Sequence, residues 1–172
     1  MTDGSLEAYI LSEIAGAEHL YARHAEAACR DGQLTRLLAV YDDAIRRREA
    51  LMEEMGVGAA CAVCSAGEKG SCCFPGIERG YDRVLLFVNL LMGCSLPTHS
   101  RLPGSCFFVG PAGCTLKARY YFCLHYFCPH LQTLLGPASI RQVLAVLGEE
   151  LSAGWDLEQA TRRWLSFTDI HG

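Results

Sequence analysis

Apolar residues recur every three or four positions in the N-terminal third of the chain, which is the spacing of one helical face. The first series predicts a helix over residues 5–28. Asp31-Gly32 interrupts the pattern, and Asp31 is a residue type that caps a following helix. A second helix then runs to Met55 and ends at Gly56. The apolar positions are Leu6, Ile10, Ile14, Ala17 and Tyr21 in the first helix, and Leu34, Leu38, Tyr41, Ile45, Met52 and Met55 in the second.

The apolar face of the second helix has the alternating four- and three-residue steps of a heptad, with Arg48 in one slot. Two successive helices with such faces are expected to form an antiparallel hairpin. The same face could instead be the seam of a homodimer formed through the N-terminal helices. The sequence leaves both arrangements open.

The middle of the chain alternates between loops and short elements. Glycine and cysteine are frequent in 57–80, which predicts irregular loop, whereas the apolar run VLLFVNLLM predicts a helix over 81–93. Prolines and glycine predict a second loop over 94–105. The segment CFFVGPAGCTL at 106–116 has apolar residues on both sides of a Gly-Pro turn, which predicts a tight β-hairpin.

The C-terminal third is again helical. From Arg119 the chain is aromatic and then helical, and Gly136 is expected to end this segment. Pro137 begins another helix, and Asp156 is expected to cap a last short one. The inward positions of these two helices are Ile140, Val143, Leu144, Leu147 and Leu151, then Leu157, Ala160, Trp164 and Leu165.

These elements predict a mainly α fold, a helical domain with a loop-rich cysteine centre and a small β-hairpin. A chain of 172 residues with 51% hydrophobic content is long enough for one core and short for two, so a single domain is expected over 1–172. Its parts are a helical hairpin (1–56), a cysteine metal-binding core (57–130) and C-terminal helices (131–172).

Charge and hydropathy exclude several classes of protein. The net charge of −4 gives no electrostatic reason to expect binding to nucleic acid or to an anionic membrane. The longest apolar run is about half of what a helix needs to cross a bilayer. The N-terminus MTDGSLEAYI has no basic segment before an apolar one, so a secretory signal is not expected. We therefore expect a cytoplasmic protein.

Cysteine usage is the strongest chemical feature. The chain has ten cysteines, and all except Cys29 lie between Cys61 and Cys128. In a reducing compartment such a cluster indicates metal binding or redox chemistry rather than a disulfide framework. Eight of them form a spaced set, C-x2-C-x7-C-C followed by four more: Cys61, Cys64, Cys72, Cys73, Cys106, Cys114, Cys123 and Cys128.

Four thiolates complete a tetrahedral zinc site or hold a [4Fe-4S] cluster, so eight could hold one centre or two. The isolated Cys29 and Cys94 are expected to be buried apolar residues. His125 and His130 lie beside the last cysteines, but surface or hydrogen-bonding roles are commoner for such residues than metal ligation.

A thiol oxidoreductase that uses Cys61 and Cys64 is the weaker alternative. Redox C-x2-C motifs lie at a helix N-terminus after a strand, which lowers the thiol pKa. Here the motif follows Gly56-Val-Gly and precedes a glycine-containing loop. Neither a serine–histidine–acid arrangement, nor a paired-carboxylate arrangement, nor a glycine-rich phosphate loop is present, so no catalytic reaction can be assigned.

The cysteine pattern, with C106-F-F-V, G113-C114-T-L, Arg119 and C123-x4-C128, resembles the YkgJ-type cysteine-cluster family, also described as a zinc- or iron-chelating domain. The resemblance covers residues 61–128 and implies that all eight cysteines of the set are metal ligands. The chain departs from the family in the longer gap between Cys64 and Cys72. It also departs at Tyr120, where the family has proline, and at Leu124, where the family has arginine.

The surroundings favour iron–sulfur slightly over zinc. Aromatic residues such as Phe107, Phe108 and Tyr121 would exclude water and oxygen, which a [4Fe-4S] cluster needs more than zinc does. Cations near the thiolates in sequence are Lys69, Arg101, Lys117 and Arg119. The expected function is a metal-binding protein with a redox or metal-handling role and a redox or protein partner. The alternative is a structural zinc module for protein–protein interaction, without catalysis.

Overall fold

The computed structural model describes residues 3–65, 73–111 and 113–171. Within these ranges the chain forms six α-helices, one 3-10 turn and one two-stranded antiparallel hairpin, which confirms the predicted mainly α fold. The elements are α1 (Asp3–Arg30), α2 (Gly32–Glu54), α3 (Val57–Ser65), the turn η1 (Ile77–Gly80), α4 (Arg83–Leu91), β1 (Val109–Gly110), β2 (Gly113–Cys114), α5 (Tyr121–His125) and α6 (Pro129–His171).

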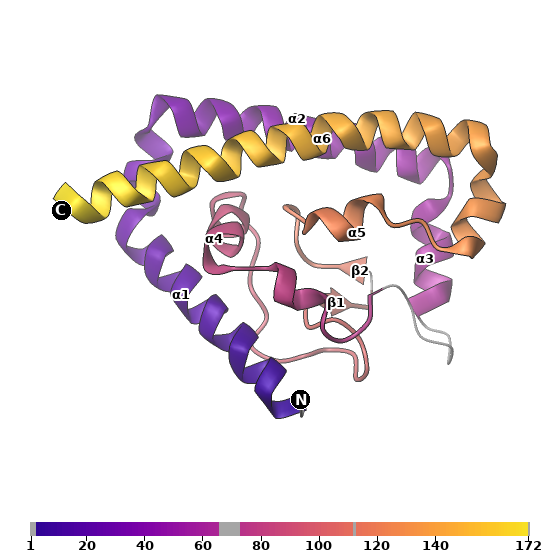
Figure 1. Ribbon diagram of the computed structural model, residues 1–172, viewed down its shortest axis with the longest axis horizontal. Coiled ribbons are helices and arrows are strands. Elements are labelled where there is room, and N and C mark those ends of the chain that lie inside the picture. The colour runs from indigo at the N-terminus through magenta and orange to yellow at the C-terminus, as the bar shows by residue number, and fades with distance from the viewer. Residues whose placement is uncertain (1–2, 66–72, 112, 172) are drawn as a thin grey trace.

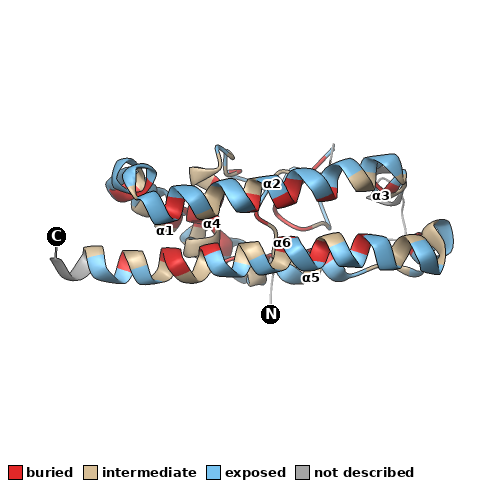
Figure 2. Cartoon of the chain, turned by 90° about the horizontal axis from the view of Figure 1, so that it is seen from above, coloured by how far each residue is buried: buried red, intermediate tan, exposed pale blue. Residues whose placement is uncertain are grey.

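The three long helices border the short elements on two sides, with α2 and α6 along one side and α1 along the other (Figure 1). Helices α2 and α6 run antiparallel and side by side, as the view from above also shows (Figure 2). Helix α1 meets the start of α2 at a sharp angle and packs along α4. The hairpin and α5 lie in the angle that α1 makes with α2 and α6 (Figure 1), which places the central cysteine segments there as well.

The expected antiparallel hairpin of the first two helices is wrong. Only Asp31 separates α1 from α2, whereas a hairpin of helices needs a loop of about two to five residues to reverse the chain. The Asp31 carboxylate accepts the backbone N–H groups of Gln33 and Leu34, each at 2.9 Å, and caps α2 as predicted. The chain therefore turns a corner at Asp31, and α2 pairs with α6 instead.

The apolar face of α2 is buried within the chain. Its predicted positions Leu34, Tyr41 and Ile45 are at most 3% exposed, and Arg48 is buried beside them. Tyr41 and Ile45 share a cluster with Val88 of α4 and Leu157 of α6. Packing against α4 and α6 accounts for the heptad-like spacing.

Two other predictions need correction. The predicted loop over 57–80 begins with helix α3, whose nine residues, VGAACAVCS, contain three alanines, the best helix former, and no proline. Asp156 does not cap a new helix, because α6 continues through it. The expected break at Gly136 is confirmed, since its φ of 69° and ψ of 167° interrupt α6 just before Pro137.

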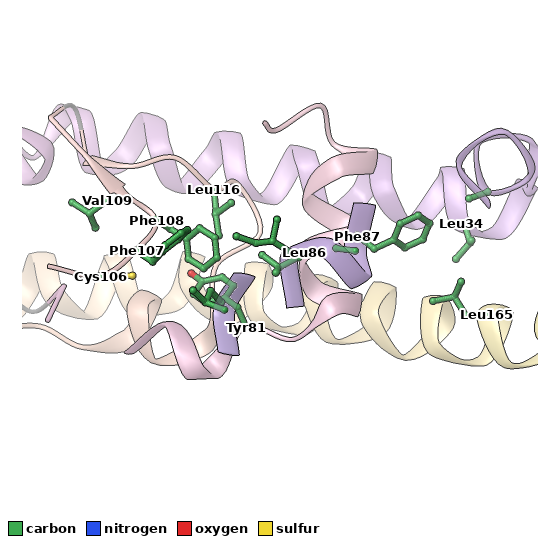
Figure 3. Packing of buried hydrophobic residues seen from close by; sticks show 14 of the residues in the cluster. Leu34, Tyr81, Leu86, Phe87, Cys106, Phe107, Phe108, Val109, Leu116 and Leu165 are labelled. Carbon is green, nitrogen blue, oxygen red and sulfur yellow. The ribbon is translucent and has the colours of Figure 1, made fainter. Parts of the chain in front are cut away.

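The main core joins α1, α4 and the segment that leads into the hairpin (Figure 3). Tyr81, Phe87 and Phe108 are among its largest fully buried side chains. Leu34 and Leu165 close one end of this core, and Cys106 lies at the other end beside Phe107 (Figure 3). The predicted helix over 81–93, the loop over 94–105 and the hairpin are all present.

One buried amide ties the chain beyond the hairpin to α4. The side chain of Asn89 is fully buried, donates to the carbonyl of Ala118 at 2.9 Å and accepts the N–H of Ala118 at 3.0 Å. Both amide groups of a buried asparagine are thereby satisfied. This contact fixes the backbone next to Arg119 and so positions the segment that continues to Cys123.

Candidate metal site

Three of the predicted ligands lie near Tyr81. Cys106 precedes β1, Cys114 ends β2 and Cys123 lies in α5, so they come from three separate segments. The Tyr81 hydroxyl lies 4.0 Å from the Cys123 sulfur. Burial raises the pKa of Tyr81 well above its ordinary value, and the nearby thiolates of Cys114, Cys123 and Cys106 raise it further. The fold therefore brings these three thiols to one region.

Cys106 is the most buried of these thiols, with 4% of its surface exposed. Burial raises its pKa to about 12, and the charges of Glu78, Cys114 and Cys123 act in the same direction. A hydrogen bond from the N–H of Phe108 opposes the rise. This thiol needs a compensating cation to lose its proton at neutral pH, as a bound metal ion would provide.

Two contacts connect the earlier cysteine segment to this region. The N–H of Cys106 donates to the carbonyl of Cys73 at 2.7 Å. Helix α3, which contains Cys61 and Cys64, packs against β2, where Cys114 lies. Cys72 lies outside the described residues, as does the side chain of Cys64.

The fit of a metal ion can be tested on the side chains that the structure describes. Among them, no three cysteine, histidine, aspartate or glutamate side chains are close enough to hold one ion. Cys128 is half-buried just before α6. The donor chemistry fits zinc or an iron–sulfur cluster, whereas a complete ligand set is not assembled by the described side chains alone.

Two cysteines and two histidines were not expected to be metal ligands, and the structure corrects the prediction for one of them. Cys29 is exposed on α1, so its predicted burial is wrong, and the neighbouring Ala28 takes the buried position. Cys94 is half-buried. The Nδ1 atom of His125 lies 2.8 Å from the carbonyl oxygen of Tyr121, and its ring stacks on the Tyr121 ring. His130 is exposed at the start of α6.

Arg119 interacts electrostatically with one of these thiols, Cys114. Burial lowers its pKa, but the negative charges of Cys114 and Tyr81 raise it more, so the net change is upward. Lys117 instead donates to the carbonyl of Met92 at 3.1 Å, and Lys69 lies outside the described residues. Arg119, one of the cations named from the sequence, is therefore near Cys114 as expected.

Sequence reasoning missed Tyr81 as the centre of this region. It follows the turn η1 and is 1% exposed, with its ring edge-on to Phe108 at 4.9 Å between centroids. No motif marks it, because its place depends on contacts with segments more than twenty residues away. The aromatic content of the neighbouring segments was the only available sign.

No family model, curated protein or solved structure matches the chain. In the part of the chain that the structure describes, none of the helices combines the length and the apolar character that crossing a bilayer requires.

Proposed function

We propose that this chain is a metal-binding protein that holds a [4Fe-4S] cluster or zinc on its cysteine thiolates, in one centre or two, and that it serves a redox or metal-handling role. The observation that supports this most directly is the approach of Cys106, Cys114 and Cys123 to Tyr81 from three segments. The contact of Cys73 with Cys106 and that of α3 with β2 bring further cysteine segments to the same region.

The chemistry of these thiols is the second support. A thiol with a pKa of about 12, as at Cys106, is inert as a nucleophile at neutral pH and becomes a thiolate only when a cation compensates its charge. Such a residue suits metal ligation better than thiol–disulfide exchange. When bound, the metal would supply folding free energy and, if it is iron–sulfur, a site for electron transfer.

The proposal has consequences for location and partner. Thiols that must remain reduced for a metal belong in a reducing compartment, so we infer a cytoplasmic protein. A redox role requires a partner that delivers or accepts electrons, and the net charge of −4 argues against nucleic acid in that role.

The first test is the content of iron, zinc and acid-labile sulfide per chain in protein purified without oxygen, with a visible spectrum. We expect about four irons and four sulfides per cluster, or one to two zinc ions. Cys114→Ser should lower the metal content, whereas the control Cys94→Ser should leave it unchanged. Wild-type protein without stoichiometric iron or zinc would contradict the proposal.

A structural zinc module that binds a protein partner is the second candidate. On α6, such a partner could contact Leu134, Leu144 and Phe167, which are 52%, 42% and 65% exposed at separate points along the helix. A colourless protein with zinc in closed four-coordinate sites would select this candidate over the redox role.

A further inference from the structure

A cavity of about 220 Å³ lies where helices α2 and α6 meet the start of α4 and the segment that leads into α5. Its volume is below the roughly 300–1,000 Å³ of sites for drug-sized ligands, so it suits a molecule of about one ring. Charged and aromatic residues make up much of its lining, among them Asp82, Tyr120, Tyr121, Trp155, Glu158 and Arg162.

The charges on the inner side of the cavity balance one another. Glu150 is fully buried and pairs with the buried Arg48, whose Nε atom lies 2.8 Å from the carboxylate. The Glu49 carboxylate lies 3.6 Å from the same arginine. Burial lowers the pKa of Arg119, and the negative charges around it, Glu49 and Glu150 among them, raise it more. Two arginines therefore face two glutamates, and these inner groups leave no net charge for a ligand.

At the rim, two carboxylates share one arginine. A terminal nitrogen of Arg162 donates to Asp82 at 2.5 Å and to Glu158 at 2.6 Å, and its Nε–H donates to Glu158 at 3.0 Å. The other oxygen of Asp82 accepts the N–H groups of Val84 and Leu85, so both oxygens of Asp82 are engaged. Two negative charges against one positive charge leave the rim with a surplus negative charge.

Glu158 has the oxygen that can still accept a hydrogen bond. Both bonds from Arg162 end on its Oε1 atom, and within the described ranges its Oε2 atom makes neither a hydrogen bond nor an ion pair. The side chain is 26% exposed, so a ligand in the cavity can reach it from solvent. A carboxylate oxygen in this state is a strong acceptor for a charged N–H donor.

Three aromatic residues line the same cavity. The Tyr120 ring packs directly on Gly80, another lining residue, and meets the Tyr121 ring edge to face with 4.5 Å between centroids. Tyr121 is 55% exposed and Trp155 is 63% exposed, so both are accessible to a ligand. Aromatic faces attract organic cations, and the surplus carboxylate at the rim acts in the same direction.

We propose that this cavity binds a small organic ammonium ion, with its N–H groups donating to Glu158 and its apolar part against Tyr121 and Trp155. The surplus negative charge selects a cation, and the Oε2 atom of Glu158 selects one that can donate a hydrogen bond. The inference goes beyond the proposed function and does not depend on a metal, since no cysteine that the structure describes lines the cavity.

The test uses benzylamine, the uncharged benzyl alcohol and the anionic benzoate as probes, with binding to the full chain measured by saturation-transfer NMR and titration. Benzylamine is protonated at neutral pH and should bind about tenfold more tightly than benzyl alcohol, because only the amine brings a positive charge to Glu158. Benzoate should bind more weakly than either. Glu158→Gln should abolish the preference for benzylamine, whereas Glu149→Gln, a change of an exposed α6 carboxylate outside the lining, should keep it.

Arg162→Gln gives a result in the opposite direction. It removes the cation of the rim and leaves both carboxylates, so benzylamine should bind several-fold more tightly while benzyl alcohol binds as before. A loss of binding through a damaged cavity would instead weaken both probes. Wild-type protein that does not bind benzylamine, or that binds benzylamine and benzyl alcohol equally, would overturn the proposal. So would a Glu158→Gln variant that retains the preference.

Discussion

Arg48 illustrates how a single residue can break the apolar pattern of a helix without exposing it to water. It occupies a slot in the buried face of α2, and its guanidinium is 2% exposed. Glu150, which is 102 positions later in the chain and fully buried, provides the compensating charge with contacts of 2.8 and 3.4 Å. The pair joins α2 to α6, and neither charge could be buried without the other.

We expect Arg48→Met to lower the free energy of unfolding by about 3–5 kcal/mol, because Glu150 would be left as a buried charge without its partner. The double variant Arg48→Met/Glu150→Leu should recover most of this loss, since it removes both charges. Urea unfolding of the three proteins measures the effect.

The exposed neighbour Arg47 provides the control. It pairs with Glu149 at 3.2 Å, and both side chains are more than half exposed. Arg47→Gln should therefore cost less than about 1 kcal/mol. If Arg47→Gln and Arg48→Met lowered the free energy of unfolding equally, burial of the Arg48–Glu150 pair would not make it more important for stability than an exposed pair.

At the level of elements, the contact between α2 and α6 depends on a glycine within α6. Gly154 faces the ring of Tyr41, and a Cβ atom built at this position would lie 3.0 Å from the Tyr41 Cε2 atom. Tyr41 is buried and cannot easily move away. The glycine thus permits the close approach of two helices, at some cost to the helical preference of α6.

Gly148 and Gly154 make a matched pair for testing this close approach. A Cβ at Gly148 meets nothing within 4 Å, so Gly148→Ala should raise the stability by about 0.5–1 kcal/mol through helix propensity alone. Gly154→Ala should lower it by about 1–3 kcal/mol, because the added methyl group overpacks against Tyr41. Thermal or urea unfolding compares them, and a gain in stability for both variants would refute the close contact.

For the whole molecule, the long helices border segments that have little regular structure of their own. The hairpin has two residues in each strand and α5 has five, so neither would be stable alone. The hairpin, the residues before it and α5 lie in the angle that α1 makes with α2 and α6, where Cys106, Cys114 and Cys123 come near Tyr81. A metal on these thiolates would connect segments that the long helices only border.

Removal of the proposed metal is therefore expected to lower the melting temperature of the whole domain, because the free energy of metal binding contributes to folding. Differential scanning calorimetry of protein as purified without oxygen and after treatment with a chelator measures the shift. Cys114→Ser should lower the melting temperature in the same way, and Cys29→Ser, a change of an exposed residue outside the predicted ligand set, should not. An unchanged melting temperature after complete metal removal would refute the structural part of the proposed function.

The candidate site was predictable in part. The spacing of the cysteines named a set of eight that includes Cys106, Cys114 and Cys123, and proximity in sequence named Arg119 together with Lys69, Arg101 and Lys117. The position of Tyr81 and the cavity beside Arg119 were not predictable, because they arise where segments distant in the sequence meet. Local composition contains no information on which distant segment will cover a given side chain.

The sequence by itself determined the mainly α fold, the cap at Asp31, the break at Gly136 and the hairpin near Cys114, because periodicity, capping and turn chemistry act over a few residues. The tertiary structure alone decided that α2 pairs with α6 rather than with α1, and that Arg48 finds a charge 102 positions away. Such pairings follow from the burial of whole faces and charges, which depends on all the elements that pack together.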